Sequence, residues 1–103
     1  MGKKVEQWIP ELPQDYNKLS SGSKRIVREE YVKQQGGRCA YCDGKLSEKP
    51  AQEVRDAYPL NMSLFPIGFL KHPVHLHHCH KTGKTISALH GYCNGIMFQY
   101  HGE

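Results

Sequence analysis

The sequence has no long hydrophobic run. Its longest apolar stretches, such as residues 67–70, are far too short to cross a bilayer, and no apolar segment follows the lysines near the N-terminus. We therefore expect neither a membrane span nor a secretory signal. Repeats and low-complexity linkers are also absent. A length of 103 residues and a hydrophobic fraction of 38% fit one domain with a thin core, and such a core usually needs a metal or disulfides.

Cysteine and histidine are the residues that the sequence does supply. Four cysteines in a chain without a secretory signal are more often metal ligands than disulfides, so metal binding and a cytoplasmic location are predicted. A formal net charge of +4 weakly favours a polyanionic partner. All histidines lie in the last third of the chain, which indicates a chemical site there: His72, His75, His77, His78, His80, His90 and His101.

The order of predicted elements gives an N-terminal arm (1–19) and a single domain (20–103). In the arm, Trp8 and Tyr16 are expected to dock on the body. A helix is expected over 24–35, because serines at 20–23 can cap its start and Gly36-Gly37 stops it. A short helix over 47–58 would hold Pro50 in its first turn. Two strands, 74–78 and 84–89, are joined by a turn at Gly83, and a last helix covers 91–100.

The apolar residues of segment 59–73 show no clear periodicity, so this segment is predicted to be a loop. We expect this loop to pack its apolar side chains against the core; they are Leu64, Phe65, Ile67, Phe69 and Leu70. Together with the helix before it, the loop forms an insert, residues 47–73, between a cysteine knuckle at 39–42 and a ββα finger at 74–100.

Two closely spaced ligand pairs predict a structural zinc site. Cys39 and Cys42 form a C-x-x-C knuckle, and His90 and Cys93 repeat that spacing at the start of the last helix. Structural zinc prefers four tetrahedral ligands of these types. A redox pair is the alternative for a lone C-x-x-C, but it does not account for the second pair.

The histidine run before the turn, residues 75–80, suggests a second, catalytic metal site together with Asn94. Neighbouring helical residues point about 100° apart, so Cys93 can face the zinc while Asn94 faces the hairpin. Phosphodiester hydrolysis needs a cation and a general base, and two adjacent histidines can divide these tasks. Strict strand alternation would separate His77 from His78, so the strand must end or bulge there. The alternatives are a second zinc site that includes Cys79 and an accidental metal-binding tract at the surface.

These residues resemble the HNH, or His-Me finger (ββα-metal), endonucleases, in particular the branch of phage recombination endonuclease VII. That branch reads as a helix ending in Q-G-G-x-C-x-x-C, then D-H-D-H, T-G and C-x-x-C-N. The likeness covers about residues 24–98, interrupted by the insert. The matching text here is Gln35-Gly-Gly-Arg-Cys39-Ala-Tyr-Cys42, His77-His-Cys-His80, Thr82-Gly83 and His90-Gly-Tyr-Cys93-Asn94.

The resemblance implies a small, zinc-stabilised α+β fold, a treble-clef-like ββα-metal finger with an N-terminal helix. It also implies a DNA endonuclease that leaves 5′-phosphate ends, by nicking or double-strand cleavage. Zinc would be bound by Cys39, Cys42, His90 and Cys93. His77 and Asn94 would bind the catalytic metal and His78 would be the general base. His80 would contact the scissile phosphate or support the site.

The chain departs from the branch at three positions. His77 and Cys79 replace aspartates and Ile86 replaces an arginine. Imidazole favours Mn²⁺, Ni²⁺ or Zn²⁺, so a preference for Mg²⁺ is less expected. Because the sequence ends soon after Asn94, at Glu103, we expect a monomer or weak dimer and not an obligate junction-resolving dimer.

A non-catalytic zinc-finger module with a decayed nuclease site, binding DNA or protein, is the alternative function. Basic side chains offer phosphate contacts under either hypothesis. For the residues of this set on the helix over 24–35, a solvated helix face is the favoured interpretation. The candidates are Lys24, Arg25, Arg28, Lys81 and Lys84.

Overall fold

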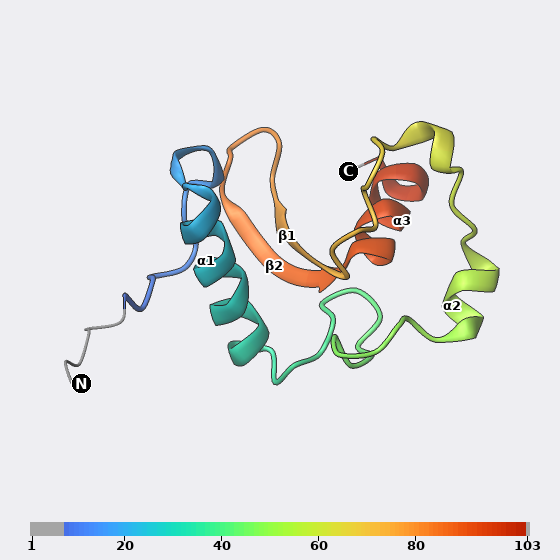
Figure 1. Ribbon diagram of the computed structural model, residues 1–103, viewed down its shortest axis with the longest axis horizontal. Coiled ribbons are helices and arrows are strands. Elements are labelled where there is room, and N and C mark those ends of the chain that lie inside the picture. Colours follow the sequence, from blue (N-terminus) through green and yellow to red (C-terminus); the bar gives the residue numbers. More distant parts are fainter. Residues whose placement is uncertain (1–7, 103) are drawn as a thin grey trace.

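The computed structural model describes residues 8–102, so the first seven residues of the expected arm and Glu103 lie outside the described residues. The chain is a small α+β protein (Figure 1). Its elements in order are a 3₁₀ helix Tyr16–Lys18, α1 (Ser21–Gln34), α2 (Gln52–Ala57), a 3₁₀ helix Met62–Leu64, β1 (Val74–His78), β2 (Thr85–His90) and α3 (Gly91–His101).

The β1–β2 hairpin lies between α1 and α3 (Figure 1). The two strands are antiparallel, and both helices contact both strands. β2 runs directly into α3, since His90 ends the strand and caps the helix. The predicted strands and the last helix are therefore confirmed, with bounds that shift by no more than one residue.

α1 begins and ends as the predicted capping residues require. The Ser20 hydroxyl accepts a hydrogen bond from the backbone nitrogen of Ser23 at 3.1 Å. At the other end, Gly36 and Gly37 both have positive φ angles, 66° and 78°, which stop the helix. Between these two ends, the Val27 side chain of α1 is fully buried. The helix starts three residues earlier than predicted because Ser20 is the serine that caps it.

Side chains of α1 fix the helix to β2. Gln35, the C-cap residue of α1, bonds to β2 as a neighbouring strand would. Its side-chain Nε2 donates to the Ala88 carbonyl at 2.8 Å, and its Oε1 accepts from the Ala88 nitrogen at 2.9 Å. The Tyr31 and Thr85 hydroxyls are hydrogen-bonded at 2.9 Å in the interior. These contacts join α1 and its C-cap residue to β2.

The hydrophobic core lies where α1, the hairpin, the knuckle and the start of α3 meet, and it is small. Its fully buried side chains are Val27, Ala88, Leu89, Cys93 and Ile96. Cys39 is also buried within it. The thin core expected from composition is thus shared with the metal-ligand residues.

The arm returns to the hairpin. The backbone nitrogen of Tyr16 donates to the Gly83 carbonyl at 2.7 Å, and that of Thr85 donates to the Gln14 carbonyl at 2.8 Å. Tyr16 therefore docks as predicted. Trp8 does not pack fully, since its side chain remains 46% exposed. The arm also forms a 3₁₀ turn where no regular structure was expected.

The insert differs from its prediction. α2 begins only at Gln52, so Pro50 lies before the helix and not in its first turn as predicted. The loop that follows does not fill the core: Ile67 is fully exposed, and Leu64 and Leu70 are also exposed. α2 lies on the far side of α3 from α1, and the chain then returns past α3 to the start of β1 (Figure 1).

Close contact between the insert and α3 depends on a glycine. A Cβ atom at Gly95 would lie 2.8 Å from Leu60 Cδ1 and 3.4 Å from Phe65 Cζ. The absence of a side chain at Gly95 therefore lets the insert approach the helix.

Within residues 8–102, no helix combines the length and the apolar character that crossing a membrane requires.

Candidate functional site

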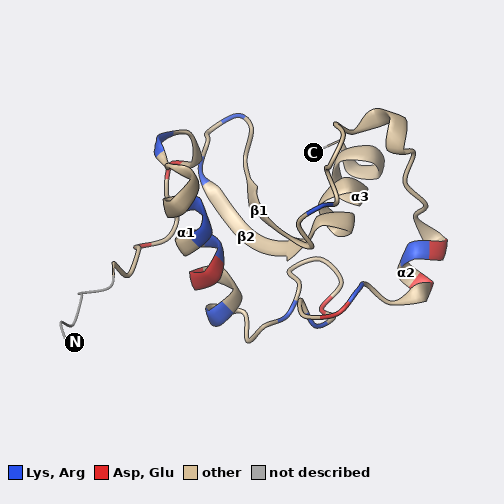
Figure 2. Cartoon of the chain, in the orientation of Figure 1, with Lys and Arg blue, Asp and Glu red and all other residues tan. Residues whose placement is uncertain are grey.

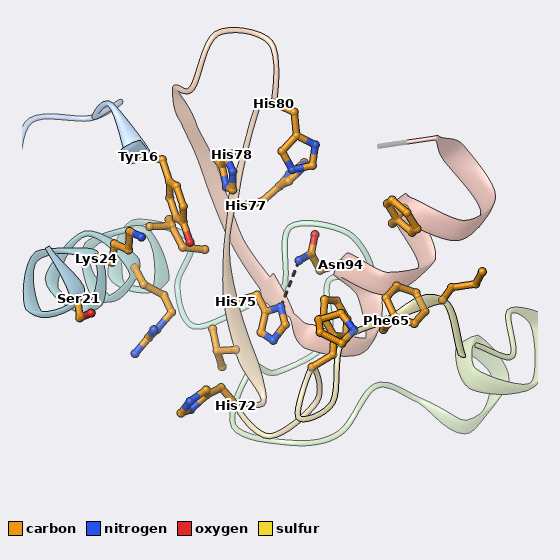
Figure 3. Close-up of a pocket in the computed structure, with 17 residues that line it drawn as sticks. Tyr16, Ser21, Lys24, Phe65, His72, His75, His77, His78, His80 and Asn94 are labelled. Atoms are coloured by element: carbon orange, nitrogen blue, oxygen red, sulfur yellow. Dashed lines mark hydrogen bonds between the residues drawn. The ribbon is translucent and has the colours of Figure 1, made fainter. Parts of the chain in front are cut away.

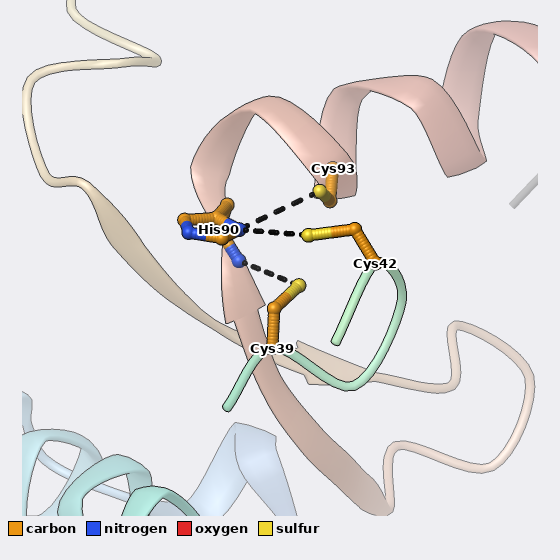
Figure 4. Close-up of side chains that lie close together, drawn as sticks. All are labelled: Cys39, Cys42, His90 and Cys93. Carbon is orange, nitrogen blue, oxygen red and sulfur yellow. Dashed lines mark hydrogen bonds between the residues drawn. The ribbon is translucent and has the colours of Figure 1, made fainter. Parts of the chain in front are cut away.

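The four predicted zinc ligands converge at the end of β2 (Figure 4). Cys39 and Cys42 lie on the knuckle after α1, His90 ends β2, and Cys93 lies in the first turn of α3. We call these residues the Cys3His cluster. Their ligand atoms all lie within 4.8 Å of one another, and His90 is only 2% exposed.

The spacing within the cluster fits a tetrahedral zinc ion. The Nδ1 atom of His90 lies 3.4 Å from Cys42 Sγ and 3.7 Å from Cys93 Sγ. With zinc–sulfur and zinc–nitrogen bonds of about 2.3 and 2.0 Å, a tetrahedron places sulfur and nitrogen ligands roughly 3.5 Å apart. The cluster could therefore hold a structural zinc through these four residues.

Hydrogen bonds around the cluster prepare its atoms for a cation. The His90 Nε2–H donates to the carbonyls of Lys45 and Glu48, at 2.9 and 2.8 Å, which leaves the Nδ1 lone pair for a metal. Backbone nitrogens of Tyr41 and of His90 donate to Cys39 Sγ, each at 3.4 Å. Hydrogen bonding with Cys93 lowers the pKa of Cys39 to about 4, although burial opposes it. The same contact raises the pKa of Cys93, so of these two thiols Cys39 is the one that favours the thiolate, the form that binds metals.

A second group of polar side chains lines a cavity of about 540 Å³ beside β1 (Figure 3). We call it the histidine cavity. It brings together the predicted residues His77, His78, His80 and Asn94. Among residues 8–102, no Asp or Glu lines this cavity. Its other lining residues are Tyr16, Ser21, Lys24, Arg28, Leu64, Phe65, Pro66, Phe69, His72, Val74, His75, Leu76 and Phe98.

A β-bulge brings His77 and His78 to the same cavity. The pairing register with β2 shifts between these two residues, so His77 is opposite Ser87 while His78 is opposite Thr85. A bulge interrupts the alternation that would send neighbours to opposite faces. The requirement that the strand end or bulge at this point is met, and both histidines line the cavity.

Asn94 contacts a histidine that the sequence did not single out. Its Nδ2 amide donates to His75 Nδ1 at 3.1 Å. In Figure 3 the amide oxygen of Asn94 points away from His75, toward the part of the cavity where His77 and His80 lie. The sequence held one signal for a role of His75 in the site. Residues two apart on a strand share a face, and His75 precedes His77 by two residues. Burial lowers the pKa of His75, which favours the neutral ring that can accept.

His78 is held between aromatic rings. The Tyr16 ring stacks on it at a centroid distance of 3.7 Å and an interplanar angle of 6°, and His80 meets it edge-on at 4.9 Å. The Lys24 ammonium lies 4.1 Å from the centroid of the Tyr16 ring. Burial lowers the pKa of His78, and the nearby His80 and His77 lower it further. His78 is therefore positioned by the arm and biased toward its neutral form.

The basic residues divide into two groups. Lys24 and Arg28 line the histidine cavity. Arg25 is instead in an exposed ion pair with Glu29 at 3.5 Å. Lys81 and Lys84 lie between β1 and β2, where Figure 2 shows blue segments at the hairpin turn, and they are not among the residues that line the cavity. Two of the five candidate phosphate contacts thus line the histidine cavity.

In the described part of the chain, the Cys3His cluster is the one group of three or more Cys, His, Asp or Glu side chains close enough to hold a metal. Among residues 8–102, the histidines and Cys79 do not form such a group. The chain matches no protein-family model, no curated protein and no solved structure.

Proposed function

We propose that the chain is a metal-dependent DNA endonuclease of the HNH, or His-Me finger, type, with a treble-clef-like zinc centre beside a ββα-metal finger. The observation that carries this proposal is the histidine cavity. There a bulged strand presents His77 and His78, and the residue after the second zinc pair, Asn94, faces the same space. The order of these groups along the chain is that of the family the sequence resembles.

The residues of the cavity supply distinct parts of phosphodiester hydrolysis. His78, in its neutral form, takes a proton from water. The water oxygen bonds to phosphorus while the bond to O3′ breaks, and O3′ takes a proton from solvent water, which leaves a 5′-phosphate and a 3′-hydroxyl. His77 and Asn94 would bind a divalent cation, whose charge stabilises the phosphate and the leaving oxygen. His80, edge-on to His78, is placed to support it or to contact the phosphate.

The lining of the cavity influences both the metal and the substrate. Without a carboxylate, imidazole and amide ligands favour Mn²⁺, Ni²⁺ or Zn²⁺ over Mg²⁺. Lys24 and Arg28 supply phosphate contacts, which position DNA without reading its sequence. Such an enzyme would act as a monomer or weak dimer in the cytoplasm of a bacterial or phage-infected cell.

The test is plasmid cleavage by the zinc-loaded protein with Mg²⁺, Mn²⁺, Ni²⁺ or Zn²⁺ added separately. We expect metal-dependent nicking, and we expect His78→Ala to lower its rate by about 10²–10⁴-fold, the usual contribution of a general base. His78→Gln, which keeps side-chain bulk against Tyr16, should be equally inactive. His101→Ala is the matched control, because His101 lies on α3 outside the cavity lining and is exposed.

The competing function is a zinc-stabilised module that binds DNA or protein without cutting. It is favoured by the absence of carboxylates in the cavity. Salt-dependent DNA binding with no cleavage under any of the four metals would establish it against our proposal. Cleavage by His78→Ala at the parental rate would remove His78 from the mechanism.

A further inference from the structure

The wall of the histidine cavity opposite α1 is aromatic. It is formed by Phe65 and Phe69 of the insert and by Phe98 of α3, and we call these three residues the aromatic wall. In Figure 3, Phe65 and the rings around it lie across the histidines from Tyr16 and Lys24. The cavity therefore has one basic side, one aromatic side and a floor of histidines.

The rings of the aromatic wall hold one another in place. Phe65 stacks on Phe69 with centroids 4.6 Å apart and meets Phe98 edge-on at 5.7 Å. Phe69 in turn meets the His75 ring at 4.9 Å. The wall is thus continuous with the strand that carries His77 and His78.

The surface of this wall is nevertheless open. Phe98 is 50% exposed, although its ring lines the cavity. An exposed aromatic surface beside a polar site is typical of a ligand-binding surface. The basic side carries Lys24 and Arg28, and no carboxylate lines the cavity, so the charge favours a ligand that is anionic at one end and flat and apolar at the other.

A nucleotide has this chemistry. We infer that the aromatic wall stacks on an unpaired nucleobase beside the phosphate held at the histidines, so that single-stranded DNA is the substrate class. In a duplex both faces of each base are covered by its neighbours, so side chains can stack on a base only after it leaves the stack. This inference rests on the proposed function for the identity of the phosphate-binding side.

The first experiment measures binding and does not require cleavage. A single-stranded oligonucleotide carrying one 2-aminopurine is titrated with zinc-loaded protein without further metal, and stacking is read as fluorescence quenching. We expect quenching by the parental chain, and Phe98→Ala should weaken binding about ten-fold, the usual effect of removing one stacking ring. Ile67→Ala is the control, since Ile67 is a fully exposed apolar residue of the insert that does not line the cavity.

Two further substitutions separate stacking from apolar contact. Phe98→Trp keeps an aromatic face and should retain both quenching and affinity. Phe98→Leu keeps an apolar side chain and should lose them. Equal behaviour of the Leu and Trp variants, or quenching unchanged in Phe98→Ala, would overturn the inference and leave the wall as a surface for an apolar partner.

Cleavage then distinguishes this inference from the proposed function. With the active metal, a single strand should be cut faster than the duplex of the same sequence, and Phe98→Ala should slow cleavage of the single strand more than cleavage of the duplex. Cleavage without a single-strand preference contradicts the inference alone. Quenching without any cleavage contradicts the proposed nuclease alone.

Discussion

At the scale of single residues, the orientation of the Asn94 amide decides which of its ends faces a metal. Only the carbonyl oxygen of an amide can bind a cation, while the NH₂ group can only donate. The 3.1 Å contact with His75 Nδ1 assigns the NH₂ group to that histidine, which leaves the oxygen for the cavity. A Cβ at Gly91 would lie 2.8 Å from His75 Nε2 and 3.0 Å from the His72 carbonyl, so the His75 ring is closely confined.

We predict that His75→Ala weakens binding of Mn²⁺ at the cavity by roughly 10–100-fold, as loss of a residue that orients a ligand usually does. In the Asn94→Asp background the same substitution should have little effect, because both terminal atoms of aspartate are oxygens and need no orientation. Titration calorimetry on zinc-loaded proteins measures all four affinities.

The double substitution also tests a direct role for His75. If His75 itself bound the metal, His75→Ala would reduce affinity equally in the parental chain and in the Asn94→Asp variant, and that result would contradict a positioning role. Retention of one zinc per chain in each variant shows that the fold is intact.

At the scale of elements, the joint between α1 and β2 depends on Gln35. We predict that Gln35→Ala lowers the free energy of unfolding by about 1–3 kcal/mol, because it leaves the Ala88 nitrogen and carbonyl without their side-chain partners. Gln34→Ala is the matched control: Gln34 bonds only to Glu30 on the helix surface, so little change is expected. Urea unfolding monitored by circular dichroism provides the measurement, and equal stability of the two variants would contradict the assigned role.

Helices and strands with local signals were predictable from the sequence. The serine cap and glycine stop of α1 act within a few residues, as does the turn at Gly83 before β2. The path of the insert was not predictable, because it depends on close contact with Gly95, far along the chain. Apolar composition alone suggested burial for Ile67, whereas the structure leaves it exposed.

The candidate site was predictable where spacing defines it. The two ligand pairs of the Cys3His cluster follow from their positions in the sequence. The contacts of His75 and Tyr16 do not, since one depends on where Asn94 lies on α3 and the other on the return of the arm to the hairpin. The catalytic roles of His77, His78 and Asn94 stay predictions.

At the scale of the whole molecule, the Cys3His cluster connects parts of the chain that are distant in sequence. It joins the knuckle after α1 to the end of β2 and the start of α3, the elements on either side of the insert. Cys39 and Cys93 also belong to the hydrophobic core. Ligand binding and core packing therefore involve the same side chains, so the metal and the fold should be strongly coupled.

This coupling predicts that removal of zinc unfolds the chain. Structural zinc contributes roughly 10–16 kcal/mol of apparent binding free energy, whereas a domain is typically stable by only about 5–15 kcal/mol in total. Chelation should therefore abolish the far-UV circular dichroism of the helices, and readdition of about one zinc per chain should restore it. Cys42→Ser should lower the zinc content and the melting temperature, while Cys79→Ser, which changes a cysteine outside the cluster, should preserve the zinc content. A chain that keeps its helical signal after complete removal of zinc would show that the thin core is sufficient without the metal.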